Sequence, residues 1–271
     1  MNNNGNQSEE PLSQYIEDNF LEVLEYLHSF QKTSSWYNEV DVTRIESEVN
    51  SIWYNAVIFK QEITDKRVSE IYEIYKNKKN KTAWFIFDHK QPEKLNNQLF
   101  SYGFKPIAKM AGMAIDLNLL SKDWTPPKDM SIRKAVTEAD FEEWYNLALN
   151  SYPMSRPTAE LFLEAAKQNV NSSSPKMAAY LIQYSGHSVG IAEAYFGEHH
   201  VGLYSIATLQ QVRKKGIGTA ATMFLLMEAY HRGYRIAVLQ ATEKGIHLYE
   251  RIGFQKHCNL SILMSTAYKN K

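Results

Sequence analysis

The residues best suited to chemistry lie in the second half of the chain, where an apolar segment ends and a basic, glycine-containing turn begins. The sequence Arg213-Lys-Lys-Gly-Ile-Gly218 stands at the expected start of a helix. Glycines there let the backbone approach a ligand closely. The unpaired N–H groups of the first helical turn, with the helix dipole, attract anions. Because Lys214 and Lys215 add positive charge, the segment predicts a cradle for a pyrophosphate group.

Other phosphate-binding loops fit this segment less well. A Walker loop closes with Gly-Lys-Ser or Gly-Lys-Thr, and a dinucleotide-binding turn has three glycines and an acidic residue after the next strand. The present segment has two glycines and neither of those endings. Glycines at a helix start also occur for tight packing alone, and the motif taken by itself leaves this alternative open.

A second motif follows one helix and one strand later. The segment Leu248-Tyr-Glu-Arg-Ile-Gly-Phe254 is typical of a short helix that carries Tyr249 and ends at Gly253. The order strand, R-x-x-G-x-G, helix, strand and L-Y-E-x-x-G-F resembles the GNAT acyltransferase superfamily over about residues 130–266. Members of that superfamily transfer an acyl group from acyl-coenzyme A (acyl-CoA) to an amine. The resemblance implies the same fold and the same class of reaction here.

By this resemblance, the donor site is built mainly from backbone groups of the cradle and of the strand before it. Cradle amides hold the CoA pyrophosphate, and strand 201–208 pairs with the pantetheine amides as it would with an added strand. In the family, this strand and the next one splay apart and open a slot for the thioester. The predicted cofactor-binding residues are Ile206, Ala207, Thr208, Arg213, Lys214, Lys215, Gly216, Ile217, Gly218, Thr219 and Thr242. Thr242 stands where many relatives carry an asparagine.

Two residues are predicted to handle protons. Tyr249 matches the family's general acid for the departing thiolate, and its alternative is a tyrosine that only packs. Glu193 is the only carboxylate within the apolar hairpin 176–196, so it is a candidate base for the amine proton, through water. A rim or substrate-anchoring role for Glu193 is an equal alternative. Tyr204 and Ser205 are weaker candidates on the neighbouring strand.

A mixed sheet is needed to bring these residues together. The second half has the order β, α, α, β, β, β, α, β, α, β, in which antiparallel strands lead into one β-α-β crossover. This order predicts an α/β fold, a mixed sheet with helices on its faces. Thr137 is the expected N-cap of the first helix. The expected strands are 130–136, 176–184, 188–196, 201–208, 235–242 and 259–266, and the expected helices are 137–149, 157–170, 216–231 and 245–251.

The first half resembles a partial copy of that ending, which suggests a degenerate internal duplication. Leu99 stands four residues before Gly103, as Tyr249 stands four before Gly253, and no R-x-x-G-x-G occurs in this half. We therefore predict a degenerate GNAT-like half that binds no CoA in the usual way and has no catalytic acid. The expected helices are 12–30, 64–76 and 92–102, and the expected strands are 50–60, 82–88 and 110–117.

The adjacent prolines Pro126 and Pro127 mark the best domain boundary, because they stop a helix and stiffen a connector. The predicted division is a disordered lead at 1–10, a degenerate GNAT-like domain at 11–125 and a GNAT acetyltransferase domain at 126–271. We expect residues 128–271 to form the cofactor site on their own. The first half is then expected to wall the acceptor side of the cleft.

Composition narrows the choice of partners. The chain has 271 residues, 30 basic and 30 acidic, for a formal net charge of +0, which argues against a non-specific nucleic-acid binder. Cys258 is the only cysteine, so we predict no disulfide framework and no thiolate zinc site. His199 and His200 are adjacent and would point to opposite faces of a strand, so no metal is predicted. No targeting or membrane segment is evident, and a cytoplasmic monomer or homodimer is expected.

The sequence therefore predicts an N-acetyltransferase that uses acetyl-CoA as co-substrate. The expected acceptor is a primary amine of a small molecule or a peptide, which attacks the thioester directly. The alternative is a non-catalytic module that binds CoA or a partner on the same scaffold. Retention of Tyr249 beside an intact cradle weighs against that alternative.

Overall fold

The computed structural model describes residues 11–265 except 77, 79, 81, 91, 92, 122, 153, 169 and 173. The predicted disordered lead at 1–10 lies outside the described residues, as does the expected end of the last strand at Thr266. Among the residues that are described, no helix has both the length and the apolar character needed to cross a lipid bilayer.

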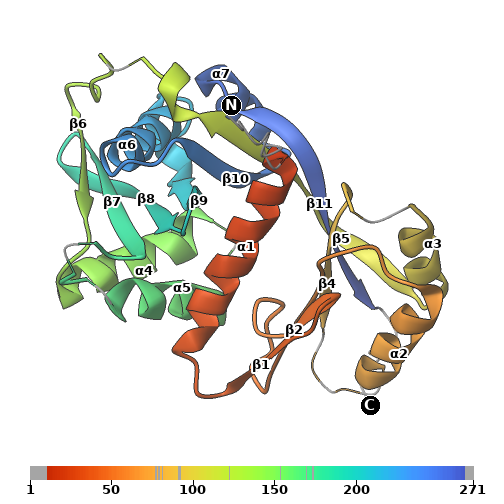
Figure 1. Cartoon of the computed structure of the whole chain (residues 1–271). Coiled ribbons are helices and arrows are strands. Elements are labelled where there is room, and N and C mark those ends of the chain that lie inside the picture. Colours follow the sequence, from red (N-terminus) through yellow and green to blue (C-terminus); the bar gives the residue numbers. More distant parts are fainter. Residues whose placement is uncertain are drawn as a thin grey trace, which may run out of the picture.

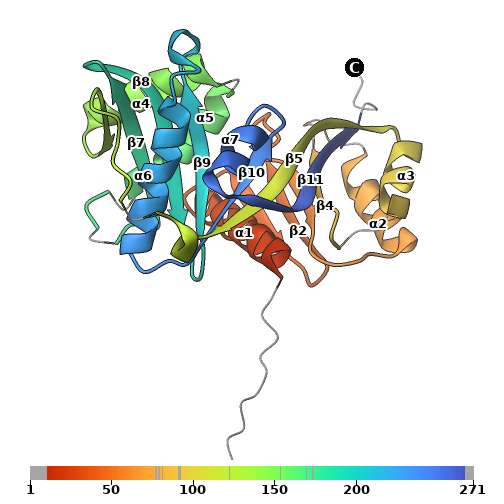
Figure 2. The ribbon, with the colours of Figure 1, turned by 90° about the horizontal axis from the view of Figure 1, so that it is seen from above.

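The described strands form one mixed sheet of 11 strands in the order β1-β2-β3-β4-β11-β5-β10-β9-β8-β7-β6 (Figures 1 and 2). The strands are β1 (Ser34–Asn38), β2 (Val42–Ser47), β3 (Ala56–Phe59), β4 (Ala83–Phe87), β5 (Phe104–Asp116), β6 (Met130–Lys134), β7 (Met177–Tyr184), β8 (His187–Phe196), β9 (Val201–Thr208), β10 (Ile236–Thr242) and β11 (Gln255–Ser265). The helices are α1 (Leu12–Ser29), α2 (Asp65–Tyr75), α3 (Glu93–Ser101), α4 (Glu138–Ser151), α5 (Arg156–Gln168), α6 (Ile217–His231) and α7 (Ile246–Ile252), with short 3₁₀ turns η1 (Leu117–Leu119) and η2 (Gln210–Val212). The predicted α/β class is confirmed.

Local sequence signals place the second-half elements where they were expected. Thr137 and Asp140 form a reciprocal capping box at the start of α4, in which each side chain accepts from the other residue's backbone N–H. At the other end of the half, α7 stops at Gly253, whose φ of 115° suits glycine and few other residues. These caps fix the helices that flank the predicted site.

The first half differs more from expectation. Two strands, β1 and β2, were not predicted, because β1 is short, polar and on the sheet edge. The predicted strand 50–60 is shorter, at Ala56–Phe59, since the residues before it form a turn. The Asn55 side chain holds that turn by accepting from Ser47 N and donating to Val49 O. Such side-chain bonds compete with strand pairing.

The two halves exchange their last long strands. β5, from the first half, lies between β10 and β11 of the second half, and pairs antiparallel with both. β11, from the second half, lies between β4 and β5 and is likewise antiparallel to each. Figure 2 shows these two strands crossing the middle of the molecule between its halves. This exchange conflicts with the expectation that residues 128–271 form the cofactor site alone, because β10 would lose the strand on one edge.

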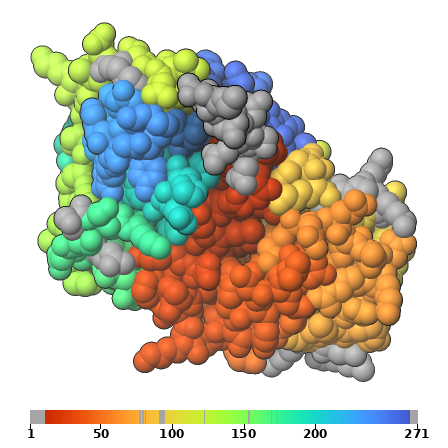
Figure 3. Space-filling model, in the orientation of Figure 1, coloured from red at the N-terminus to blue at the C-terminus, as the bar shows by residue number. Residues whose placement is uncertain are grey.

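Helix α1 strengthens the connection between the halves. Its apolar face, which includes Ile16, Phe20 and Leu27, belongs to the same buried cluster as Trp144 of α4 and Phe162 of α5. Figure 3 shows the red N-terminal segment lying between the green and blue second half and the orange remainder of the first half. A second cluster lies under α6, and a third under α2 and α3. The main core is therefore shared by both halves.

Candidate functional site

The sheet opens between β9 and β10. These parallel strands pair only at Val201–Ala237 and Gly202–Val238, although β9 continues to Thr208 and β10 to Thr242. Beyond Gly202, the β9 edge that faces β10 pairs with no strand in the described part of the chain, while its other edge stays paired with β8. An exposed strand edge presents N–H and C=O groups to an extended ligand. The splay expected from the family resemblance is therefore present.

A β-bulge lies on β9 just inside this opening. Glu193 of β8 pairs with Tyr204 and Ile191 pairs with Ala207, so two residues of β9, Ser205 and Ile206, face a single residue of β8. Ser205 has a φ of 50°, an uncommon conformation for a residue other than glycine. Bulges of this kind redirect a strand and its side chains, often at functional sites. The predicted pantetheine-binding segment thus begins at a local change of direction.

The cradle lies at the N-terminus of α6. Gly216 is the N-cap, with a φ of 77°, and no side chain caps the helix there. A Cβ added to Gly216 would meet nothing within 4 Å, so the space in front of the first turn is open. A Cβ on Gly218 would instead lie 3.2 Å from Cδ1 of Leu248 on α7. One glycine of the motif therefore keeps the anion site accessible, and the other lets α6 and α7 pack closely.

Basic side chains around the cradle differ in what they contact. The Arg213 guanidinium donates to the backbone oxygens of Thr208, at 3.2 Å, and Ser151, at 2.9 Å. It therefore joins the end of β9 to the end of α4. The Lys215 ammonium lies 5.1 Å from the ring centre of Tyr184. The predicted role of Arg213 as a direct cofactor contact stays a prediction, and its observed contacts are with the protein backbone.

Tyr249 lies on α7, beside the end of β10. Its ring packs edge-on against Phe254, with ring centres 5.7 Å apart, and closely against Gly245. Among the described residues its hydroxyl has no hydrogen-bond partner. Burial and, to a smaller extent, the nearby Tyr152 together raise the pKa of Tyr249 to about 12. The phenol therefore holds its proton at neutral pH and is able to donate it.

Glu193 lies on β8, cross-strand from Tyr204, and its exposed fraction is 0%. Burial raises the pKa of its carboxyl to about 8, and the Ser205 hydroxyl opposes the rise. Neither carboxyl oxygen has a hydrogen-bond partner of ordinary geometry in the described part of the chain. An unpartnered buried carboxyl is costly, which is often a mark of a functional group. Its complete burial removes the alternative of a rim residue.

Three further residues near the site or singled out in the sequence are Tyr204, Tyr152 and Cys258. Tyr204 is partly buried and donates from its hydroxyl to Asn19 Oδ1 of α1, at 2.9 Å. Tyr152, at the C-cap of α4, was not predicted, yet it lies close enough to Tyr249 to influence its pKa. The residues that put Tyr152 there are far from α7 in the sequence, so no local signal identified it. Cys258 is buried, and burial raises the pKa of its thiol to about 12, which keeps the thiol protonated at neutral pH.

The described residues of the first half differ from the second half at the positions that correspond to the cradle and to Tyr249. Helix α2 starts where a second cradle would lie, but the Thr64 side chain accepts from Arg67 N and so caps the helix itself. Asp65 adds a negative charge in the first turn. Leu99, at the position that corresponds to Tyr249, is fully buried in the core of this half. Thr64 already occupies one N–H of this helix start, the charge of Asp65 disfavours an anion there, and Leu99 has no proton to donate.

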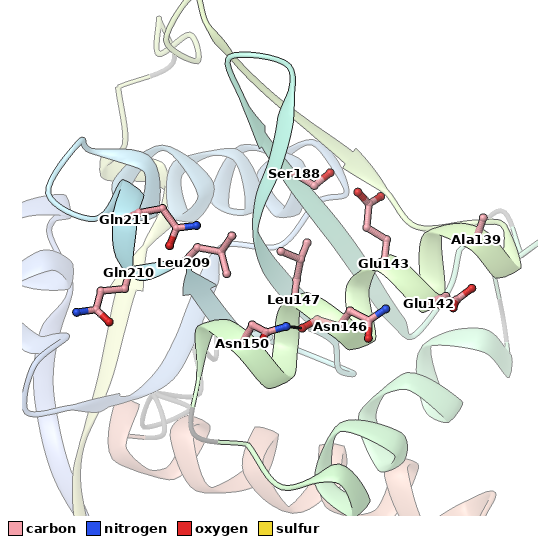
Figure 4. Close-up of a pocket in the computed structure, with 10 residues that line it drawn as sticks. All are labelled: Ala139, Glu142, Glu143, Asn146, Leu147, Asn150, Ser188, Leu209, Gln210 and Gln211. Atoms are coloured by element: carbon pink, nitrogen blue, oxygen red, sulfur yellow. Dashed lines mark hydrogen bonds between the residues drawn. The ribbon is translucent and has the colours of Figure 1, made fainter.

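A shallow groove of about 870 Å³ lies beside the cradle, on the opposite side of the strand end from the slot. Figure 4 shows it between α4 and the ends of β8 and β9, where Gln210 and Gln211 lead into the cradle. Its lining is rich in carboxamides, and Asn150 donates to the Asn146 backbone oxygen at 2.7 Å. The groove is separate from the opening between β9 and β10.

The site combines an open strand edge with a helix N-terminus that no described side chain caps, an arrangement whose geometry suits an extended, phosphate-bearing ligand. Residues 141–254 match the model of the acetyltransferase (GNAT) family. The chain therefore carries a GNAT-family domain in its second half. Comparison with curated proteins gives no match.

Solved structures show that the similarity in fold extends over both halves. A GCN5-related N-acetyltransferase from Kribbella flavida has a TM-score of 0.72 and 14% identity, over 95% of this chain and 96% of that one. One from Sphaerobacter thermophilus has a TM-score of 0.65 and 14% identity, over 96% and 93%. A tandem GNAT protein from the clavulanic acid biosynthesis pathway has a TM-score of 0.56 and 11% identity, over 98% and 97%. The predicted GNAT-like fold of the first half is confirmed.

Proposed function

We propose that this protein is an N-acetyltransferase that transfers the acetyl group of acetyl-CoA to a primary amine by direct attack. The observation that carries the proposal is the continuity of the open β9 edge with the uncapped start of α6, with Tyr249 nearby on α7. A CoA-sized ligand needs both an extended amide partner and a phosphate site, and these two features supply them in order.

The donor is proposed to lie along β9 with its pyrophosphate at α6. Backbone groups of Ile206, Ala207 and Thr208 pair with the pantetheine, and the amides from Lys214 to Thr219 hold the phosphates. Open space at Gly216 is consistent with this fit, because a side chain there would fill the phosphate position. Thr242, at the end of β10, is proposed to contact the donor from the opposite edge of the slot.

Proton transfer is assigned to two groups. Acetyl-CoA supplies the acetyl thioester, and the amine nitrogen forms the new bond to the acetyl carbon as the carbon–sulfur bond breaks. Glu193, in its ionised form, takes the proton that the amine loses, through water. Tyr249 gives its proton to the departing sulfur, consistent with a phenol that is protonated at neutral pH. Most of the rate enhancement then comes from positioning the amine against the thioester.

The test is to titrate the full chain calorimetrically with acetyl-CoA and to screen primary amines for release of free CoA. We expect binding of acetyl-CoA and release of CoA that depends on one class of amine. Reactions without amine and without protein are the controls, because slow hydrolysis of the thioester also releases CoA.

Two results would contradict the proposal in different ways. Binding of acetyl-CoA with no transfer to any amine would favour a non-catalytic CoA-binding module. An absence of binding would show that the open strand edge and the cradle serve another ligand. Detection of the acetylated amine by mass spectrometry separates transfer from hydrolysis.

A further inference from the structure

Helix α1 has a second face, distinct from its apolar one, that contacts the β8–β9 hairpin of the other half. Its residues recur at helical spacing and therefore lie on one side of the helix. They are Tyr15, Asn19, Glu22 and Tyr26. The Tyr15 ring stacks on His200 at 4.0 Å, and the Tyr26 ring lies 5.5 Å from that of Tyr195. Tyr15 and Tyr26 pack against the cluster that both halves share, to which Tyr195 of the hairpin belongs.

The closest contact on this face is between Asn19 and Gly202. A Cβ on Gly202 would lie 1.9 Å from Asn19 Oδ1, so any residue larger than glycine would displace the helix or the strand. Asn19 is 1% exposed, and its carboxamide makes two hydrogen bonds to the hairpin. Its Nδ2 donates to His200 O at 3.1 Å, and its Oδ1 accepts from the Tyr204 hydroxyl at 2.9 Å. One side chain of the first half thus holds residues on either side of Gly202.

This position in the strand is where the sheet begins to open. Gly202 makes the last pair between β9 and β10, and Tyr204 is the residue before the bulge at Ser205. Tyr204 also pairs directly with Glu193. A shift of the chain at residues 200–204 would therefore move three features together: the open edge of β9, the bulge, and Tyr204 beside Glu193.

We propose that Asn19 is a positioning residue for the donor slot, through which α1 of the degenerate first half sets the course of β9 as it leaves β10. The proposal rests on the proposed function for its effect on transfer. Its effect on the strand itself does not depend on any activity. Asn19 touches neither donor nor acceptor and acts through Tyr204 and the backbone of β9.

The experiment compares Asn19→Ala and Tyr204→Phe, which remove the same hydrogen bond from opposite ends, with their double variant. Tyr26→Phe is the matched control, because it removes another hydrogen bond between the halves, to Ala165 O, away from the slot. Each variant is measured in the full chain by kcat and KM for acetyl-CoA, by calorimetric Kd and by amide hydrogen exchange of residues 203–208. Thermal unfolding reports the general loss of stability.

We expect Asn19→Ala to lower kcat on the order of 10-fold and to weaken acetyl-CoA binding by roughly 3-fold or more, because small misplacements of a bound donor are costly. Exchange should rise at residues 203–208 in Asn19→Ala and Tyr204→Phe but not in Tyr26→Phe. The double variant should lose little beyond Asn19→Ala alone, because that substitution already removes the bond to Tyr204 together with the bond to His200 O.

The inference is overturned if Asn19→Ala lowers the unfolding temperature as Tyr26→Phe does while kcat, Kd and exchange in β9 stay at the control's values. If Asn19→Ala does not fold, the same measurements on Tyr204→Phe decide the question: kcat, Kd and exchange in β9 at the control's values would overturn the inference. If wild-type protein neither binds nor transfers from acetyl-CoA, the proposed function fails. Hydrogen exchange in β9 then still decides whether Asn19 positions the strand.

Discussion

Burial acts in the same direction on Tyr249 and Glu193 but leaves them in different states. It raises the pKa of both groups, to about 12 for the phenol and to about 8 for the carboxyl. A phenol with a raised pKa remains an acid throughout the physiological range. A carboxyl with a raised pKa becomes a base only as the pH approaches 8. The two residues are thereby suited to two separate proton transfers, in which Glu193 accepts a proton and Tyr249 donates one.

Tyr249→Phe tests the acid. The substitution keeps the ring and its packing on Phe254 and removes only the hydroxyl. We expect kcat to fall on the order of 10²-fold, with little change in the Kd for acetyl-CoA. Steady-state kinetics and calorimetry on the same preparation measure both. Unchanged turnover at every pH would make Tyr249 a packing residue.

Glu193→Gln tests the base through its pH dependence. In the wild type, transfer should rise with pH up to about 8 as the carboxyl ionises, and the glutamine variant should lose this rise along with most of its activity. The folded pKa lies above the usual value for glutamic acid, so the folded state holds a proton that the unfolded state releases between about pH 4 and pH 8.

The same substitution has a stability consequence of known sign. Because the folded state binds the extra proton in that interval, the wild type loses stability as pH rises through it, by up to about 1.4 kcal/mol per pH unit. Glu193→Gln removes the ionisation. The free energy of unfolding of the variant should therefore increase relative to that of the wild type as the pH rises from 5 to 8. Urea unfolding across this range measures the difference. A difference that is constant with pH would show that the carboxyl ionises at an ordinary pKa.

At the scale of elements, the site depends on what is missing: a strand partner for the end of β9 and a side-chain cap for α6. Helix α2 of the first half shows the contrast, since Thr64 caps it and Asp65 follows. The free N–H groups at α6 retain their attraction for an anion, whereas those at α2 are satisfied or screened by a negative charge.

Gly216→Glu tests the cradle as an element. The new side chain would place a negative charge where phosphate oxygens are proposed to meet the α6 amides, and we expect binding of acetyl-CoA to be lost. Gly216→Gln is the matched control, because it adds a side chain of the same size at the same left-handed φ of 77° without charge, and so separates the effect of charge from that of bulk. Calorimetric titration of both variants measures the effect. Near wild-type affinity in a folded Gly216→Glu protein would place the pyrophosphate elsewhere.

At the scale of the whole molecule, the exchanged strands make the halves interdependent. A fragment of residues 128–271 would lack β5 beside β10 and α1 against β9, and would expose the apolar surface that they cover. We expect this fragment to be insoluble or to unfold without a cooperative transition. Co-expression with residues 1–127 should restore a soluble complex. Circular dichroism and urea unfolding check both. A folded fragment that binds acetyl-CoA would restore the original expectation of an independent second half.

The sequence by itself determined the features that depend on near neighbours. Apolar periodicity located α1, the capping residues located the starts of α2 and α4, and the paired motifs around Gly216 and Tyr249 identified the GNAT fold. These signals are local, because a helix cap or a helix N-terminus is formed by residues within one or two turns of each other.

The tertiary structure decided which distant segments meet. The sequence patterns of the long strands β5 and β11 indicate strands but do not specify their partners. Only the complete sheet shows that β5 pairs with β10 of the second half and that β11 pairs with β4 of the first half. Nothing near Asn19 in the sequence indicates its close contact with Gly202, and nothing near Arg213 indicates its hydrogen bond to Ser151 O. Strand pairing and buried hydrogen bonds join residues more than a hundred positions apart. Their partners are chosen by the packing of the complete sheet, which no local pattern contains.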